Sequence, residues 1–492
     1  MDEKMNKSKQ PSIKLNLLMN MILTMSSFIF PLITFPYVSR ILLAEGNGKV
    51  QMAASFVAYF SLLAQLGIPT HGIRACAAAR DNKLELTRAV HELIVIQSVT
   101  VLLSYALFTV CLAYIPKLQN EKTLYLITSA RIFFGAVGME WLFKALERYS
   151  YITIRSLVFK VISLVAMFLL VHSKEDYVIY GGISVMAAVG SNIMNLSQIP
   201  KYVYLKPVGN YNFKKHLKPI FVLFAYVCAT TIYTNLDSVM LGFMTTDTDV
   251  GYYSVAIKIK DVLVSVVTAL GVVLLPRVSY YYEQGRLDEF WNMAAKALRV
   301  VLLISIPLAV YFMIYADNSI YFLSGDGYAG SILPMIVIMP TLICIGVTSV
   351  TGVQVLIPTK RENIVLYASI VGAVVDCILN VLLIPSLRAT GAAIGTLAAE
   401  AVVLVIHLWV LWKDVHGMMK IKEIGKILGA TIISGLASAW VMFIGASDFV
   451  TLALSASLFF CVYAVLLHIF RESAFMQIEE TAKTWIQSKR KH

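Results

Sequence analysis

Charged side chains are scarce in this sequence, and hydrophobic side chains take their place. Asp, Glu, Lys and Arg make up 14% of the 492 residues, whereas 58% of the residues are hydrophobic. Soluble globular domains carry roughly 25% charged residues, so the composition excludes a water-soluble protein and indicates a membrane protein. The formal net charge of +12 therefore indicates Lys and Arg residues in the loops that fix the orientation of the chain in the membrane, and not nucleic-acid binding.

The sequence also lacks the usual signatures of disulfide, metal and nucleotide chemistry. Its six cysteines are scattered, mostly in apolar segments, and no two form a CxxC pair. The stretch "GDGYAG" at 325–330 follows no predicted strand, and "GNGK" at 46–49 lacks the spacing and the Ser or Thr of a phosphate-binding loop. We therefore expect no metal site, no cofactor, no ATPase activity within this chain and no nucleic-acid partner.

Long apolar runs, by contrast, recur along the whole chain. A transmembrane helix needs about 20 predominantly apolar residues, and the sequence offers about fourteen such spans, centred near residues 27, 58, 102, 130, 163, 187, 229, 263, 306, 341, 374, 401, 435 and 459. With the N-terminus inside, the expected cytoplasmic segments and the adjoining helix ends hold 32 Lys and Arg residues, and the opposite side holds six. This asymmetry predicts that both termini are cytoplasmic.

A weak internal repeat divides the chain into two halves. "LAEGNGKVQMAASF" after the first span resembles "TTDTDVGYYSVAIKI" after the seventh, which pairs Gly48 with Gly251. An offset of six spans preserves orientation, so we expect parallel repeats. The predicted fold is an all-α polytopic membrane protein with two six-helix lobes and two extra C-terminal helices. Its segments are an N-terminal lobe at 1–200, a basic cytoplasmic linker at 201–219, a C-terminal lobe at 220–412, and the last two spans with a cytoplasmic tail at 413–492.

The eighth span carries charges well inside an apolar stretch. Helical spacing places one set of its polar residues on a single stripe, which comprises Ser254, Lys258, Asp261, Ser265 and Thr268, and points Lys260 elsewhere. A charge at the bilayer centre costs at least about 2.5 to 3.5 kcal/mol, so such a stripe should face protein or water. Two interpretations remain open, because Lys258 and Asp261 either line a cavity or neutralise each other as a buried ion pair.

Other spans carry comparable polar residues. The seventh has Tyr226, Tyr233, Asn235 and Asp237, the eleventh has Asp376, and the twelfth has Glu400. Hydroxyl and glycine positions in such stripes are typical of close helix packing, so the charged residues are the stronger candidates for a cavity.

Two arginines complete the candidate set. Arg131 lies inside the fourth span near Gly135 and Gly138, where another helix or a ligand can approach closely. Arginine is permanently charged and can bind phosphate through two parallel N–H groups. Arg40 ends the first span after two prolines, and it either faces the same cavity or extends to the membrane interface.

The segments "FPYVSRILLAEGNGKVQMAASF" and "LAQLGIPTHGIRACAAARDNK", together with "GMEWLFKALERYSYITIRS" at 138–156, resemble the polysaccharide repeat-unit flippases. These proteins, often called Wzx-type, belong to the multidrug and oligosaccharidyl-lipid exporter superfamily. The resemblance covers essentially the whole chain. One departure is that Phe143 and Lys144 stand where the family often has a Gln-Gly-type pair after Trp.

The resemblance implies transport of an undecaprenyl-diphosphate-linked oligosaccharide from the cytoplasmic to the outer leaflet of a bacterial plasma membrane, by alternating access of two lobes. It implies no enzymatic activity, and it makes other membrane proteins of glycan assembly conceivable partners. Within this interpretation Arg40, Arg131 and Lys258 are expected to contact the diphosphate, and Tyr226, Tyr233 and Asn235 to face sugar. Asp237, Asp261, Asp376 and Glu400 are expected to be acidic residues of the cavity.

Two alternative functions stay open at this point. A cation-coupled multidrug exporter of the same superfamily usually carries acidic residues in the first lobe's spans, and spans one to three here have none at mid-depth. A membrane-embedded glycan polymerase or ligase generally works through large external loops, whereas the longest one here, near 316–331, has about 16 residues.

Overall fold

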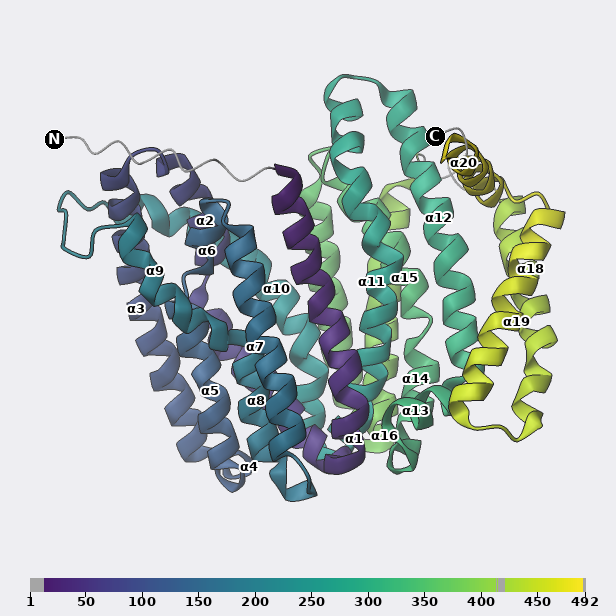
Figure 1. The fold of residues 1–492 in the computed structure, drawn as a ribbon, viewed down its shortest axis with the longest axis horizontal. Coiled ribbons are helices and arrows are strands. Elements are labelled where there is room, and N and C mark those ends of the chain that lie inside the picture. The colour runs from purple at the N-terminus through teal and green to yellow at the C-terminus, as the bar shows by residue number, and fades with distance from the viewer. Residues whose placement is uncertain (1–12, 413, 415–420, 490–492) are drawn as a thin grey trace. The chain divides into compact units, whose positions relative to one another are not determined.

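The chain folds into helices throughout its described length (Figure 1). The computed structural model describes residues 13–412, 414 and 421–489, and these residues contain no strand. The expected all-α class is therefore confirmed. The chain divides into two compact units between Gly251 and Tyr252, which are called the first and the second unit below.

The first unit is built from α-helices that alternate between long apolar segments and short connectors. Their bounds are α1 Ile13–Gln65, α2 Ile68–Ala79, α3 Lys83–Tyr114, α4 Pro116–Asn120, α5 Lys122–Val137, α6 Glu140–Ala145, α7 Tyr149–Leu170, α8 Tyr177–Val189, α9 Ile193–Tyr202 and α10 Lys214–Met244. Two short 3₁₀ helices, η1 Lys174–Asp176 and η2 Gly190–Asn192, lie before and after α8.

The second unit continues in the same manner. Its α-helices are α11 Asp247–Glu283, which starts in the first unit, α12 Leu287–Ile314, α13 Ala316–Ser324, α14 Ile332–Ile338, α15 Thr341–Thr348, α16 Glu362–Val410, α18 Ile421–Ala439, α19 Asp448–Ile469 and α20 Ser473–Lys489. The 3₁₀ helices η3 Asp326–Ser331 and η5 Trp440–Ile444 and the π-helix η4 Ser349–Leu356 join them.

Two of the longest helices each contain a break. In α1 the backbone leaves the helical region at Leu43, with φ 57° and ψ −176°, and in α16 it does so at Arg388, with φ 51° and ψ −128°. Each of these helices therefore consists of two legs, and each contains two of the predicted spans. Pro31 and Pro36 lie inside the first leg of α1 without ending it.

The number of spans differs from the sequence expectation. Among the described residues nine helices are long and apolar enough to cross a membrane, or ten if the bent pair Asp326–Ile338 and Thr341–Leu356 is one span. The count of about fourteen is therefore not confirmed. One reason is that Leu15–Ala79 and Glu362–Val410 are each a single continuous candidate although each holds two predicted centres.

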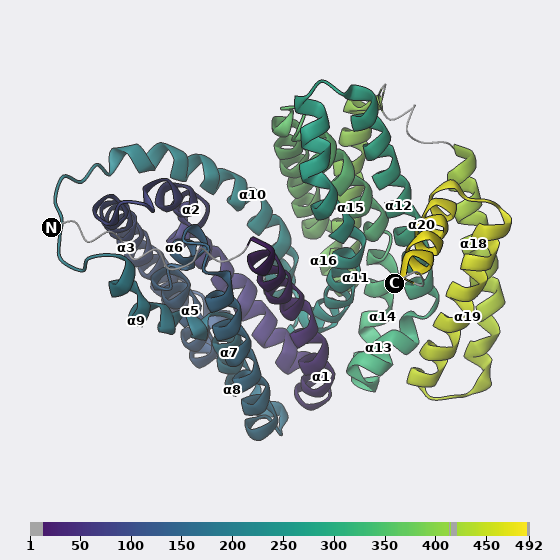
Figure 2. The same ribbon diagram turned by 45° about the horizontal axis from the view of Figure 1, so that its top comes forward.

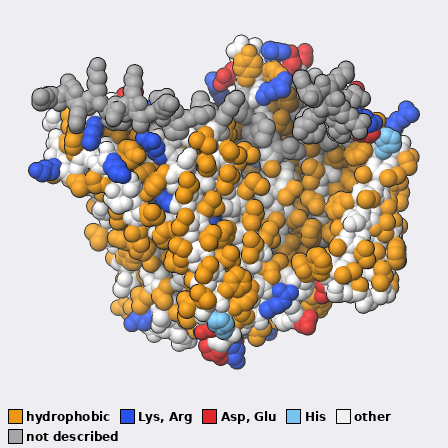
Figure 3. Space-filling view, in the orientation of Figure 1, with side chains coloured by type: hydrophobic (Ala, Val, Ile, Leu, Met, Phe, Trp, Pro, Cys, Tyr) orange, Lys and Arg blue, Asp and Glu red, His pale blue; other side chains and the backbone are white. Residues whose placement is uncertain are grey.

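Hydrophobic side chains cover the outside of the helices. On the face seen in Figure 3 they occupy the middle of each unit, and most charged side chains lie towards the upper and lower edges. Many large apolar residues are widely exposed, among them Leu102 at 71%, Leu169 at 68% and Leu436 at 73%. In water such a surface would be unfavourable, so it indicates a multi-pass membrane protein.

The two compact units divide the chain at a different place from the predicted lobes, whose bounds stay a prediction. The predicted C-terminal lobe begins at residue 220, whereas α10 packs against α1 and α2 and belongs to the first unit (Figure 2). The basic linker is held to α3, where the backbone N–H of Tyr204 donates to Thr87 Oγ1 at 3.1 Å and Arg88 Nε donates to the Gly209 carbonyl at 3.2 Å.

Gly48 and Gly251, which the repeat aligns with each other, lie at one close crossing. A Cβ atom on Gly48 would come 1.7 Å from the Asp247 carbonyl oxygen, and one on Gly251 would come 1.9 Å from the Ala44 carbonyl oxygen. The second leg of α1 and the first turn of α11 therefore cross with their backbones in contact, which glycine alone permits.

Candidate functional site

A polar cavity of about 620 Å³ lies within the first unit. Its walls come from four places in the sequence: the second leg of α1, the turn into α2, the middle of α5 and the middle of α10. The polar residues that line it are Gln51, Ser55, Ser61, Gln65, Thr70, Arg131, Thr231, Thr234 and Asn235.

Arg131 is the one charged side chain among the described residues that line this cavity. It is partly buried, and it forms no ion pair or hydrogen bond with any residue that the structure describes. Removing a guanidinium group from water without a protein partner is costly. The arrangement is therefore suited to an anion that enters the cavity and accepts hydrogen bonds from the guanidinium.

Amides and hydroxyls surround Arg131. On α10, Asn235 Nδ2 donates to the Thr231 carbonyl at 3.0 Å and lies 3.2 Å from Thr234 Oγ1. On α1, Gln65 approaches α5 so closely that a Cβ on Gly135 would lie 3.1 Å from its Nε2. These groups can both donate and accept hydrogen bonds, which matches the hydroxyl groups of a sugar or the oxygens of a phosphate.

Close packing shapes the end of the cavity near α2. A Cβ on Gly67, a lining residue, would come 2.3 Å from the Ile220 carbonyl oxygen and 2.8 Å from Cβ of Leu223. The turn between α1 and α2 therefore touches the α10 backbone directly. A movement of α10 relative to this turn would change the width of the cavity.

The structure brings together two of the predicted site residues. Arg131 and Asn235, which are 104 positions apart, line the same cavity. Asp237 follows on α10, is 5% exposed and is not among the lining residues. The side chains of Tyr226 and Tyr233 lie outside the described residues.

Arg40 is not among the lining residues of this cavity. It is exposed on α1, and its Nη1 donates to the Pro36 carbonyl one turn earlier at 2.8 Å. This geometry fits the interfacial role that the sequence left open, and a contact between Arg40 and substrate stays a prediction.

The charges of the eighth span lie in the second unit, on α11. Lys258 is partly buried. Asp261 pairs with Lys260 at 3.0 Å, and the two side chains are 56% and 13% exposed. Helical spacing places Lys260 about 100° away from the stripe that contains Asp261, and the long Lys260 side chain nevertheless reaches the Asp261 carboxylate.

The acidic candidates on α16 lie in the interior of the second unit. Asp376 and Asn380 are fully buried, and a Cβ on Gly395 would lie 2.9 Å from Asp376 Oδ1 and 2.5 Å from Asn380 Oδ1. Nearby in sequence, Thr396 Oγ1 lies 2.7 Å from the Tyr253 hydroxyl. The two legs of α16 thus meet at a polar contact, and Glu400 is partly buried on the second leg.

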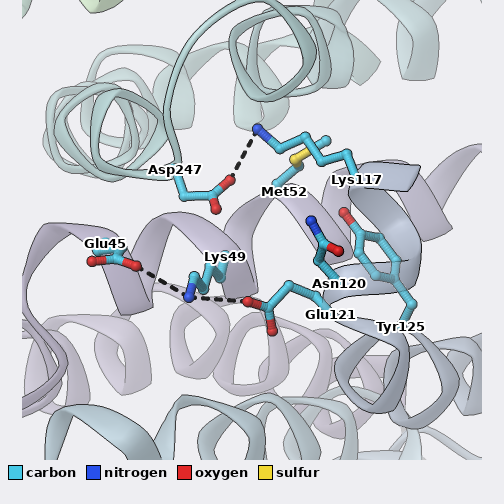
Figure 4. Close-up of a pocket in the computed structure, with 8 residues that line it drawn as sticks. All are labelled: Glu45, Lys49, Met52, Lys117, Asn120, Glu121, Tyr125 and Asp247. Carbon is cyan, nitrogen blue, oxygen red and sulfur yellow. Dashed lines mark ion pairs between the residues drawn. The ribbon is translucent and has the colours of Figure 1, made fainter. Parts of the chain in front are cut away.

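A second pocket, of about 450 Å³, lies at the predicted outer end of the first unit (Figure 4). Lys49 reaches between Glu45 and Glu121, at 3.1 and 3.0 Å. Lys117 lies 3.3 Å from Asp247. Because its lysines are paired with carboxylates, this pocket is less suited to an anion than the Arg131 cavity.

Sequence reasoning missed the α1 wall of the Arg131 cavity. Gln51, Ser55 and Gln65 follow helical spacing, so a test of the second span for a polar stripe was the signal that could have found them. The described residues contain no group of three or more His, Cys, Asp or Glu side chains that could hold a metal ion.

Two family models match the sequence. The model described as "Polysaccharide biosynthesis protein" matches residues 13–282, more than half of the chain, and the model described as "MatE" matches residues 223–382. The two matches overlap in α10 and α11 and together span residues 13–382, which include most of the first unit and part of the second.

Relatives that match at low identity carry the names of transporters and flippases. A "Putative O-antigen transporter" of Escherichia coli (strain K12) is 22% identical over 394 residues, which cover 80% of this chain and 95% of that protein. A protein of the same name from Shigella dysenteriae is 24% identical, with 80% and 99% covered. The "Probable low-salt glycan biosynthesis flippase Agl15" of Haloferax volcanii is 22% identical, with 63% and 66% covered.

Solved structures share the fold. "Lipid II flippase MurJ, inward closed conformation" aligns with a TM-score of 0.77 at 15% identity, over 92% of this chain and 98% of that one. A "multidrug resistance MATE family transporter of the MOP superfamily", in its inward-facing conformation, aligns with a TM-score of 0.59 at 13% identity, over 81% and 98%. At these identities the likeness establishes the fold alone.

Proposed function

The chain belongs to the polysaccharide biosynthesis protein family and is a membrane transporter, and from that premise we propose that it flips a lipid-linked oligosaccharide. The proposed substrate is a repeat unit carried on undecaprenyl diphosphate. The proposed direction is from the cytoplasmic to the outer leaflet of a bacterial plasma membrane, by alternating access. Both termini are then cytoplasmic, as the distribution of Lys and Arg predicts.

The single observation that carries this proposal is the Arg131 side chain, which faces a polar cavity and has no partner among the described residues. A diphosphate would supply a negatively charged partner for Arg131, and its oxygens can accept two parallel N–H hydrogen bonds from the guanidinium. The glycan brings hydroxyl groups that match the amides of Gln51, Gln65 and Asn235. Neither part of the substrate can cross hydrocarbon unaided.

The cavity fits an anion better than the cationic compounds of a multidrug exporter. Its described lining contains no carboxylate, so a cationic drug would meet Arg131 without a compensating charge. The polymerase or ligase alternative is weaker still, because most of the longest predicted outer loop folds into α13 and η3 and leaves little chain for a catalytic loop.

Reconstitution in liposomes tests the proposal. Purified protein is incorporated with a fluorescent lipid-linked oligosaccharide, and the fraction of glycan exposed to an external glycan-specific enzyme is followed over time. We expect exposure of the diphosphate-linked substrate to be accelerated over protein-free liposomes, and no acceleration for the same glycan on a neutral ether-linked polyprenol. Equal rates for the charged and the neutral carrier would contradict a site built for the diphosphate.

A further inference from the structure

Two histidines and a glutamate form a chain of hydrogen bonds beside the Arg131 cavity. Nε2 of His71, on α2, lies 2.8 Å from Nδ1 of His216, at the start of α10. Nε2 of His216 lies 2.7 Å from Oε2 of Glu92, on α3. His216 is 3% exposed and Glu92 is fully buried. We call these three residues the histidine relay.

Several charged groups face the histidine relay. Lys215 Nζ lies 2.8 Å from the same Glu92 oxygen that His216 contacts, and the backbone N–H of Asn212 donates to the other oxygen at 2.6 Å. On α2, the positive charge of Arg74 repels a positive charge on His71. Among the described contacts of the histidine relay, Glu92 is therefore the one carboxylate that balances the positive charges of Lys215 and Arg74.

The remaining helix packed on α2 adds no charge to the relay. α6 meets α2 through Trp141, whose ring lies against Gly72. The charged residues of α6, Glu140 and Lys144, pair with each other at 2.8 Å. Glu140 also accepts a hydrogen bond from Arg155.

The histidine relay can take up one proton without losing a hydrogen bond. With both rings neutral, His71 Nε2–H donates to His216 Nδ1, and His216 Nε2–H donates to Glu92. When a proton joins Nδ1 of His71, the Nε2 proton of His71 can pass to Nδ1 of His216. His216 then carries the positive charge, donates to both neighbours and forms an ion pair with Glu92. Imidazole is the side chain that accepts such a proton near neutral pH.

The histidine relay lies near the end of the cavity that is formed by the turn into α2. His71 follows Thr70, a lining residue, and His216 lies one turn before Ile220, whose carbonyl oxygen a Cβ on the lining residue Gly67 would approach to 2.3 Å. A positive charge on the histidine relay therefore changes the electrostatic potential at this end of the cavity. It also changes the packing between the turn into α2 and α10.

We propose that the histidine relay is a proton-binding site, and that a proton on the relay and a diphosphate in the Arg131 cavity bind cooperatively. This inference rests on the proposed function, because it takes the diphosphate of the substrate as the second ligand. A positive charge on His216 favours an anion in the cavity. By linkage the anion favours proton binding to the same extent.

Diphosphate binding to the purified full-length protein tests the cooperativity. Inorganic diphosphate is titrated calorimetrically at about pH 6 and about pH 8, in buffers of different ionisation enthalpy, which reports the protons taken up on binding. At the lower pH, wild type should bind diphosphate at least roughly fivefold more tightly than the His216→Gln variant does. Wild type should also take up more protons on binding than the variant. The ligand's own protonation is common to both proteins and cancels in the comparison.

His91→Gln is the matched control. His91 is also a histidine of α3, but its ring contacts the Tyr211 hydroxyl at 3.1 Å and the Tyr204 carbonyl at 2.9 Å. This variant should behave like wild type. His71→Gln should lose the excess proton uptake as His216→Gln does, because either substitution interrupts the relay.

Two outcomes would overturn the proposal in distinguishable ways. Diphosphate that binds to wild type and to His216→Gln with the same pH dependence and the same proton uptake contradicts the cooperativity alone. Diphosphate that binds to neither protein at any pH contradicts the anion site of the proposed function, and the cooperativity with it. A ¹⁵N-histidine NMR titration serves as the check on the relay itself, since independent titration of His71 and His216 would also contradict it.

Discussion

Asp261 forms an ion pair with its sequence neighbour Lys260, at a distance of 3.0 Å. Lys260 and Lys258 on α11 therefore have different expected roles: Lys260 forms this ion pair, and Lys258 is proposed to contact the diphosphate. Lys258→Met should therefore lower transport by roughly tenfold or more, the scale of a lost charged hydrogen bond. Lys260→Met is the matched control and should keep transport within about twofold of wild type.

The double variant Lys258→Met with Asp261→Leu distinguishes a substrate contact from a structural ion pair on α11. Asp261 is 56% exposed and pairs with Lys260, so its replacement alone should cost little, and normal flipping by the double variant would remove Lys258 from the site. If Lys258 contacts the diphosphate, the variant should reach the membrane but fail to flip. Asp261→Asn alone should retain measurable transport in the same liposome assay.

The ion pair between Lys117 and Asp247 should stabilise the predicted outer end of the first unit. Lys117 also donates to the Gly242 carbonyl, and its side chain is 30% exposed, against 20% for Asp247. For a pair with this much exposure we expect a coupling of about 0.5 to 1 kcal/mol. A double-mutant cycle with Lys117→Met and Asp247→Asn, measured by thermal unfolding in detergent, checks it. Additive single effects would show that the pair contributes nothing.

Gly251→Ala should destabilise the first unit, because the new Cβ would lie 1.9 Å from the Ala44 carbonyl oxygen. Such overpacking typically costs about 1 to 3 kcal/mol. The matched control is Gly425→Ala, whose Cβ would meet nothing within 4 Å, so that it should be neutral or slightly stabilising. The midpoint of thermal unfolding is the measurement, and equal midpoints for the two variants would contradict the close crossing.

Cysteine labelling tests the orientation of the chain. Single cysteines at Lys83, Lys214 and Arg361 should react only with reagents that reach the cytoplasm, and cysteines at Asn120, Glu175 and Asp326 only with reagents added outside. The reason is the excess of Lys and Arg on the expected cytoplasmic side. Reaction of position 326 from the cytoplasm would reverse the orientation of that part of the second unit.

Much of the fold follows from local pattern. Apolar runs of sufficient length predicted the helices, and polar residues inside those runs identified Arg131 and Asn235 one at a time. The positions of the breaks, Leu43 and Arg388, were not predicted, because no Gly or Pro stands at either position and tertiary packing sets the backbone there. The helix resumes directly after each break, so two predicted spans form the two legs of one element in α1 and in α16.

The contacts that define the site lie beyond local pattern. His71 and His216 are 145 residues apart, and each alone looks like an ordinary polar residue near a helix end. The same holds for Arg131 and Gln65, which meet in one cavity because Gly135 lets α1 approach α5. Sequence spacing gives the face of its own helix on which a residue lies. Which residue of a neighbouring helix it contacts depends on the packing of the whole unit.

The most direct test of the account is the initial rate of diphosphate-linked oligosaccharide flipping in liposomes by Arg131→Ala, compared with Arg131→Lys, at matched amounts of folded protein. We predict that Arg131→Ala falls to the protein-free rate and that Arg131→Lys retains part of the activity, because lysine keeps the charge but loses the two parallel N–H donors. Flipping by Arg131→Ala at the wild-type rate would contradict the proposal that Arg131 binds the diphosphate in this cavity.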